Sequence, residues 1–77
     1  MNREKIKEKI VQIAEESIGA YLKEDESLQD SGVDSLSLVT LVVSIEENFG
    51  IAFTDDDLQP EKLRMLANLI SLTEKYL

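Results

Sequence analysis

The segment from Ser35 to Phe49 constrains the fold of this chain more than any other, because its apolar residues would lie on almost every face of a helix. It lacks the alternation and the turns that are typical of strands, and an uninterrupted segment of this length favours a helix. Its polar residues form one narrow stripe, which consists of Ser37, Thr40, Ser44 and Glu47. Such a helix must be flanked by other helices, and part of its apolar surface is available to a partner.

Two further segments, residues 2–21 and residues 64–77, have apolar residues at the spacings of three and four that are typical of amphipathic helices. Gly19 weakens the last turn of the first helix and is a candidate for its C-terminal end. The residues expected to be buried are Ile6, Ile10, Ile13, Ala14, Ser17 and Tyr21 in the first segment, and Leu66, Leu69, Ile70, Thr73 and Leu77 in the last. No segment indicates a strand. The sequence therefore predicts an all-α fold, a small antiparallel bundle of three main helices plus one short helix, in a single domain over residues 1–77.

The loop between the first two helices, residues 22–33, is unusually long for a small domain, and loops of this length are often functional. Leu28 and Val33 are expected to anchor this loop to the core. Asp34 is the expected N-cap of the second helix, since its carboxylate can accept hydrogen bonds from the amides of the first turn.

The composition excludes several classes of function. The chain has no cysteine and no histidine, so it can form neither a disulfide nor a thiolate metal site, and it lacks the general base that serine catalysis usually needs. Sixteen acidic and eight basic residues give a net charge of −8, and no lysine or arginine lies between Glu24 and Glu61. Such a charge repels nucleic acid and anionic membranes, and it steers the chain toward basic partner surfaces.

The run from Asp55 to Asp57 follows Thr54, and we interpret it as the solvent-exposed start of a brief helical turn that Thr54 caps. Consecutive acids do not match the alternating ligands of a calcium-binding loop, so no metal site is expected. Pro60 suits the first position of another short helical turn. No apolar run is long enough to cross a bilayer and the charged first residues do not begin a signal peptide, so we expect a cytoplasmic monomer without membrane insertion.

Ser35 lies in the sequence Gly32-Val33-Asp34-Ser35-Leu36, where an acidic loop gives way to the apolar helix. A serine at the start of a helix most often serves as a cap. Because Asp34 is available for that role, the hydroxyl of Ser35 is also well placed to be modified by another enzyme.

These five residues, followed by an apolar helix that ends in Glu46-Glu47-Asn48-Phe49-Gly50, resemble the sequence of an acyl or peptidyl carrier protein. Residues 53–58 and 60–64 resemble the segment that leads into this family's last helix, so the likeness covers essentially the whole chain. The resemblance implies that a phosphopantetheinyl transferase attaches 4′-phosphopantetheine from coenzyme A to Ser35. The arm would hold acyl or aminoacyl groups as thioesters, and the chain would be a carrier without catalytic activity of its own.

The resemblance also implies a partner-binding face beside Ser35. Leu36, Val39 and Val43 share one face at helical spacing, and the other apolar residues of the helix already provide a buried set. The predicted partner-binding residues are Asp34, Leu36, Val39, Val43, Glu46 and Glu47. A loading enzyme and synthase or transferase enzymes with basic docking surfaces would bind here. Leu38, Leu41 and Ile45 are expected to line a cleft for the acyl chain.

The sequence departs from the fatty-acid-synthesis members of this family at Ser37 and Thr40, where those members typically carry acids. This departure and the run from Pro60 to Arg64 favour a stand-alone carrier in a polyketide or nonribosomal-peptide-like pathway. A housekeeping acyl carrier protein of fatty acid synthesis is one alternative. An unmodified acidic helical interaction module, which would use the apolar face as a docking groove, is another.

Overall fold

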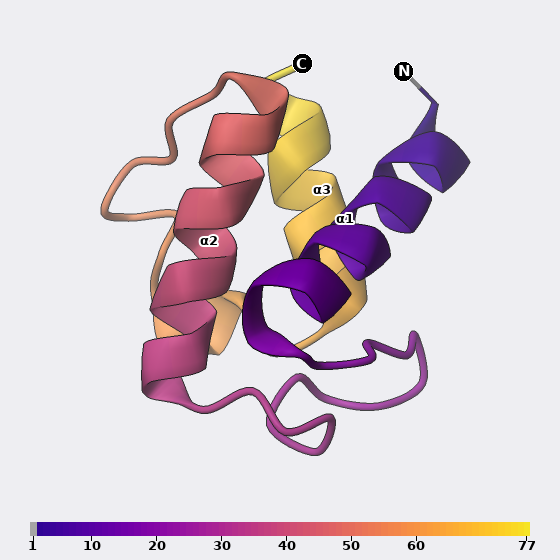
Figure 1. Cartoon of the computed structure of the whole chain (residues 1–77). Coiled ribbons are helices and arrows are strands. Elements are labelled where there is room, and N and C mark those ends of the chain that lie inside the picture. Colours follow the sequence, from indigo (N-terminus) through magenta and orange to yellow (C-terminus); the bar gives the residue numbers. More distant parts are fainter. Residues whose placement is uncertain (1) are drawn as a thin grey trace.

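A computed structural model describes residues 2–77 of the chain as three α-helices and one short 3-10 helix (Figure 1). The helices are α1 (Arg3–Ile18), α2 (Ser35–Phe49), η1 (Pro60–Lys62) and α3 (Leu66–Lys75). Within the described residues the only β-type pairing is an isolated bridge between Ser27 and Met65. The predicted all-α fold, with three main helices and one short helix, is confirmed. None of the helices in this part of the chain combines the length and the apolarity needed to cross a membrane.

Helix α2 begins and ends at the residues that the sequence predicts. The Asp34 carboxylate accepts a hydrogen bond from the backbone N–H of Ser37 at 2.8 Å, which makes Asp34 the N-cap. At the other end Gly50 adopts a left-handed conformation with φ +67°, which a glycine reaches without steric cost.

Helices α1 and α3 are shorter than the segments predicted for them, and the C-cap of α1 is Gly19, the candidate end that the sequence offers. Helix α1 ends at Ile18 because Gly19 takes a left-handed conformation, so Tyr21 lies beyond the helix and is exposed instead of buried. Helix α3 begins only at Leu66, because Met65 is extended and pairs with Ser27. Leu77, which was also expected to be buried, lies beyond α3 and is exposed.

Helix α1 packs against both α2 and α3 and runs in the opposite direction to them (Figure 1). At the start of α1, Arg3 donates to Glu74 near the end of α3 at 3.3 Å. Further along, the Lys9 ammonium lies 5.5 Å from the centre of the Phe49 ring at the end of α2. Helices α2 and α3 run in the same direction, because the connection of residues 50–65 returns along the bundle before α3 begins.

The core draws on the three α-helices and on the connections between them. Leu28 and Val33 are buried, so the predicted anchoring of the first loop is confirmed. The buried hydrophobic residues are Ile6, Ile10, Ile13, Ala14, Ala20, Leu22, Leu28, Val33, Leu41, Val42, Ile45, Phe53, Leu63, Leu66, Leu69 and Ile70. Thr73 is also fully buried, and its hydroxyl donates to the carbonyl of Leu69 at 2.8 Å, which satisfies the one polar group of this side chain.

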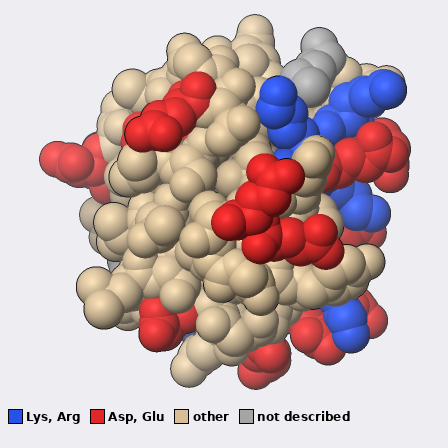
Figure 2. Space-filling view, in the orientation of Figure 1, with Lys and Arg blue, Asp and Glu red and all other residues tan. Residues whose placement is uncertain are grey.

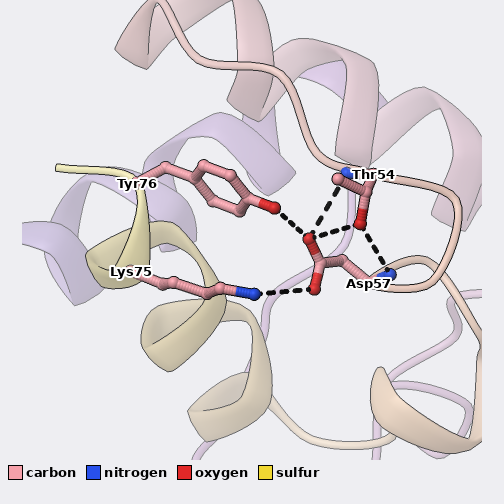
Figure 3. Close-up of polar contacts among 4 residues, drawn as sticks. All are labelled: Thr54, Asp57, Lys75 and Tyr76. Atoms are coloured by element: carbon pink, nitrogen blue, oxygen red, sulfur yellow. Dashed lines mark hydrogen bonds and ion pairs between the residues drawn. The ribbon is translucent and has the colours of Figure 1, made fainter.

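Asp57 is buried rather than solvent-exposed, which corrects the interpretation of the acidic run (Figure 3). Its carboxylate accepts hydrogen bonds from the Tyr76 hydroxyl and from the Thr54 hydroxyl, the latter at 2.8 Å, and pairs with the Lys75 ammonium at 3.3 Å. Thr54 thus caps a turn as predicted, since its hydroxyl also accepts from the backbone N–H of Asp57. The Tyr76 ring packs edge-on against Phe53. These contacts fasten the end of α3 to the connection that follows α2.

The hydrogen bond from Tyr76, supported by that from Thr54, holds the pKa of Asp57 well below its usual range. We therefore expect Asp57→Asn to lower the melting temperature at neutral pH, because the folded state loses its charge-assisted contacts. The pKa of Asp57 is lower in the folded state than in the unfolded state, so its ionised carboxylate stabilises the fold at pH values above the unfolded pKa of about 3.9. This stabilisation is lost as the pH falls through the folded-state pKa. Thermal denaturation followed by circular dichroism at pH 7 and between pH 4 and 2 measures both effects.

Asp56→Asn is the matched control, since Asp56 is exposed and lies next to Asp57 in the same turn. It should leave the melting temperature almost unchanged at every pH. Equal decreases in melting temperature for the two substitutions would contradict this account of the cluster. A decrease for Asp57→Asn that does not become smaller on acidification would also contradict it.

The capping of α2 gives a second prediction. Because Asp34 caps the helix, Ser35→Ala should change the free energy of unfolding by no more than about 0.5 kcal/mol, as for an ordinary surface substitution. Asp34→Ala removes the cap and should lower the melting temperature clearly further. Chemical denaturation of both variants, with the helical circular dichroism as the signal, tests this order. A larger loss for Ser35→Ala would mean that the serine is a structural residue.

Candidate functional site

Ser35 is the first residue of α2, and its side chain is exposed. The Asp34 carboxylate holds the Ser37 amide, and this hydrogen bond lowers the pKa of Asp34, so the cap is ionised at neutral pH. The backbone N–H of Leu38 already bonds to the Asp34 carbonyl at 2.8 Å. The backbone of Leu36 also favours the ionised Asp34 carboxylate. The Ser35 hydroxyl thus lies at the positive end of the helix, next to the first backbone amides.

An open hollow of about 950 Å³ lies beside Ser35. Three segments line it: the first loop, the start of α2 and the stretch that leads into α3. The lining residues are Ser27, Leu28, Gln29, Gly32, Val33, Asp34, Ser35, Leu38, Glu61, Leu63, Arg64 and Met65. Leu28, Val33 and Leu63 are buried, so they give the hollow an apolar floor. Gly32 has φ +93°, a conformation that favours glycine, where the loop turns toward α2.

Only one of the three residues expected in a cleft lines this hollow. Leu38 is half-buried and belongs to its wall, whereas Leu41 and Ile45 are fully buried in the core. The difference follows from helical geometry. Leu41 and Ile45 face the other helices, while Leu38 lies within one turn of Ser35, at the edge where the first loop meets α2.

The apolar seam, which we define as Leu36, Val39 and Val43, is exposed as the sequence predicts. Their side chains are 81%, 62% and 44% exposed, while Leu41, Val42 and Ile45 on the same helix are buried. Figure 2 shows basic side chains gathered over the start of α1, whereas the surface over α2 consists mostly of uncharged residues with scattered acids. Helix α2 therefore presents to solvent an apolar face that begins next to Ser35.

The two glutamates at the far end of the seam differ in their surroundings. Glu46 is half-buried, and its carboxylate accepts a hydrogen bond from the backbone N–H of Phe53 at 2.7 Å. It therefore holds the chain after α2 in place, a structural role that the sequence analysis missed. Glu47 is exposed.

Arg64, Glu61 and Met65 also belong to the site, although the sequence analysis did not include them. The backbone N–H of Leu28 donates to the carbonyl of Arg64 at 2.8 Å, and the bridge between Ser27 and Met65 continues this pairing. These contacts bring the stretch before α3 to the first loop. No spacing along the chain indicates the pairing, because it depends on how the connection of residues 50–65 returns.

The side chains around Ser35 limit the kinds of chemistry that the hollow can supply. The chain has no imidazole and no thiol, so the hollow provides neither a histidine base nor a cysteine nucleophile. Within residues 2–77, no cluster of three or more acidic side chains is arranged to hold a metal ion.

Comparisons with known proteins identify the family to which this chain is similar. Residues 4–70 match the family model described as the phosphopantetheine attachment site. The chain is 36% identical over 80 residues to an acyl carrier protein of Thermotoga maritima, and the alignment covers 99% of this chain and 96% of that protein. It is 33% identical over 79 residues to an acyl carrier protein of Akkermansia muciniphila, over 97% of this chain and 96% of that protein.

Two further similarities concern a large synthase and a solved structure. A stretch of 55 residues is 42% identical to the non-reducing polyketide synthase pks12 of Talaromyces marneffei, over 71% of this chain and 3% of that protein. The crystal structure of an acyl carrier protein from Thermotoga maritima superposes with a TM-score of 0.83 at 30% identity, over 99% of this chain and 91% of that chain.

Members of this family are non-catalytic carriers whose cofactor, 4′-phosphopantetheine, is covalently attached, and in general they interact with phosphopantetheinyl transferases and synthase enzymes. The family match spans most of the chain, and the solved relative has the same three-helix fold. The chain therefore belongs to the acyl carrier protein family.

Proposed function

We propose that this protein carries acyl or aminoacyl groups on a 4′-phosphopantetheine arm attached to the Ser35 hydroxyl. The observation that supports this assignment most strongly is the position of Ser35. Its side chain is exposed at the first residue of α2, and Asp34 already performs the capping role that a serine would otherwise have there. A hydroxyl without a structural role, in a chain of this family, is the natural attachment point.

The residues around Ser35 fit the chemistry of this group. Its phosphodiester is an anion, and the positive end of the α2 dipole favours an anion at this place. The apolar floor of the hollow, formed by Leu28, Val33 and Leu63, suits the aliphatic part of the arm. When bound, the group supplies a terminal thiol that holds the cargo as a thioester.

Attachment requires a transferase, since the chain has no histidine to act as a base. The Ser35 oxygen forms a bond to the phosphorus atom that bears the pantetheine, and the pyrophosphate bond of coenzyme A breaks. The adenosine 3′,5′-bisphosphate part leaves, and the hydroxyl proton passes to a base of the transferase. The role of this chain is to present the hydroxyl at an exposed helix start.

We further propose that partner enzymes dock on the apolar seam, with Asp34, Glu46 and Glu47 as flanking charges. The partners are the transferase, the enzyme that loads the cargo, and the synthase or transferase enzymes that receive it. Basic groups on a partner would complement the acidic surface. The centre of the contact is apolar, because the seam is exposed and the neighbouring Ser37 and Thr40 are uncharged.

We also propose the kind of pathway in which this carrier acts. Ser37 and Thr40 favour a specialised pathway of the polyketide or nonribosomal-peptide type, and the similarity to part of a polyketide synthase is in keeping with it. The similarity to bacterial acyl carrier proteins equally suits fatty acid synthesis, which is the alternative. In either case we propose a cytoplasmic monomer. An unmodified interaction module would use the same seam without any group on Ser35.

The first experiment tests attachment. The purified protein is incubated with coenzyme A, Mg²⁺ and a broad-specificity phosphopantetheinyl transferase, and its intact mass is measured. We expect an increase by the mass of one phosphopantetheine in the wild type. Ser35→Ala, which should fold normally, should show no increase. Failure of several transferases to modify the folded wild type, or modification of Ser35→Ala, would contradict the assignment and favour the interaction module.

The second experiment tests the docking surface. Val43→Asp places a charge in the apolar seam, at a side chain that is 44% exposed, so the fold should tolerate it. We expect the kcat/KM of the phosphopantetheinyl transferase for this protein to fall by about ten-fold, the loss typical of one central interface residue. Gln59→Asp is the control, since it adds the same charge at an exposed residue outside the seam. Unfolding of Val43→Asp would show that Val43 belongs to the core, and equal rates for both variants would exclude the seam as the docking surface.

A further inference from the structure

Among the described residues that line the hollow beside Ser35, Arg64 is the only basic one. Its side chain is exposed, and none of the ion pairs among the described residues involves it. The acidic residues that line the same hollow are Asp34 and Glu61. Asp34 is occupied by its hydrogen bond to the Ser37 amide. The guanidinium of Arg64 is thus a cation without an ion-pair partner at the site.

The backbone of Arg64 is fixed although its side chain is exposed. Its carbonyl accepts the hydrogen bond from Leu28, and the next residue, Met65, pairs with Ser27. The first loop that makes these contacts continues directly into Asp34 and Ser35. The backbones on the two sides of the hollow are therefore held together by the fold, and Arg64 and Ser35 line the same hollow from these two sides.

Modification of Ser35 changes the charge balance of the hollow. A phosphodiester adds one negative charge next to two carboxylates, and Arg64 is the lining residue that can offset it. A guanidinium binds phosphate oxygens with two parallel N–H donors, which fixes direction as well as distance. Arginine is therefore better suited than lysine to hold such a group in one orientation.

We propose that Arg64 is a positioning residue that binds the phosphodiester on Ser35 and directs the first part of the arm into the hollow, against Leu38 and Met65. This inference rests on the proposed attachment to Ser35 and extends it to a residue on a different segment of the fold. The contact holds the arm near the protein between transfers. It is weak enough to open, because Arg64 is exposed and the contact is screened by salt.

The test compares Arg64→Gln with Lys62→Gln. Lys62 lies two residues away in η1, is also exposed and does not line the hollow, so both variants lose one positive charge from the same segment. Each protein is loaded to completion with excess transferase, and loading is verified by intact mass. Nuclear Overhauser effects are then measured between the two methyl groups of the arm next to the phosphate and the side chains of Leu38 and Met65. The ³¹P chemical shift is recorded at low and high salt.

We expect the Overhauser effects of Arg64→Gln to fall two- to five-fold and its ³¹P shift to lose its salt dependence, in line with one exposed ion pair. Lys62→Gln should match the wild type in both measurements. Normal loading with the same arm contacts in all three proteins would overturn this inference and leave the attachment proposal intact. An equal loss in Lys62→Gln would also overturn it, because it would indicate a general charge effect. A wild type that cannot be loaded would overturn both proposals.

Discussion

The burial of one face of α2 is the constraint on which the rest of the structure depends. Leu41, Val42 and Ile45 are buried, and α1 is the helix that packs against both α2 and α3. Helix α2 is apolar around most of its circumference, and its neighbours cover only one side of it. The opposite side, with Leu36 and Val39, stays in water at a cost in hydrophobic free energy. A surface of this kind is expected where a protein must bind several partners in turn.

The same packing determines where Ser35 lies. Val33 is buried just before α2 and Asp34 caps the helix, so the chain enters α2 in one fixed conformation with Ser35 at its exposed start. The stretch before α3 completes the site, because the backbone of Arg64 pairs with that of Leu28. The Asp57 cluster, which joins the end of α3 to residues 54–57, fastens the other end of this long connection. The hollow beside Ser35 is thus formed by segments that are distant in the sequence.

The sequence predicts those parts of the molecule that depend on neighbouring residues. The bounds of α2, its Asp34 cap and the exposure of Leu36, Val39 and Val43 all follow from helical spacing and local capping rules. Two of the predictions fail because a distant contact decides the outcome. Asp57 is buried by Tyr76, and Arg64 enters the site through a pairing with the first loop. Neither contact leaves a signal in spacing or composition. The likeness to carrier proteins implies an attachment at Ser35 and names Asp34 and Leu38 beside it, but it does not indicate Glu61, Arg64 or Met65.

We propose that the protein acts through a phosphopantetheine arm on Ser35. The most direct test is fragmentation mass spectrometry of the intact protein isolated from the cells that produce it, which locates any added group on the sequence. We expect the mass of one phosphopantetheine, with or without an acyl or aminoacyl cargo, on the fragment that contains Ser35. A protein with an unmodified Ser35 in every molecule, or with the group on another residue, would contradict the account. The mass of the cargo in the same spectrum would also identify the pathway.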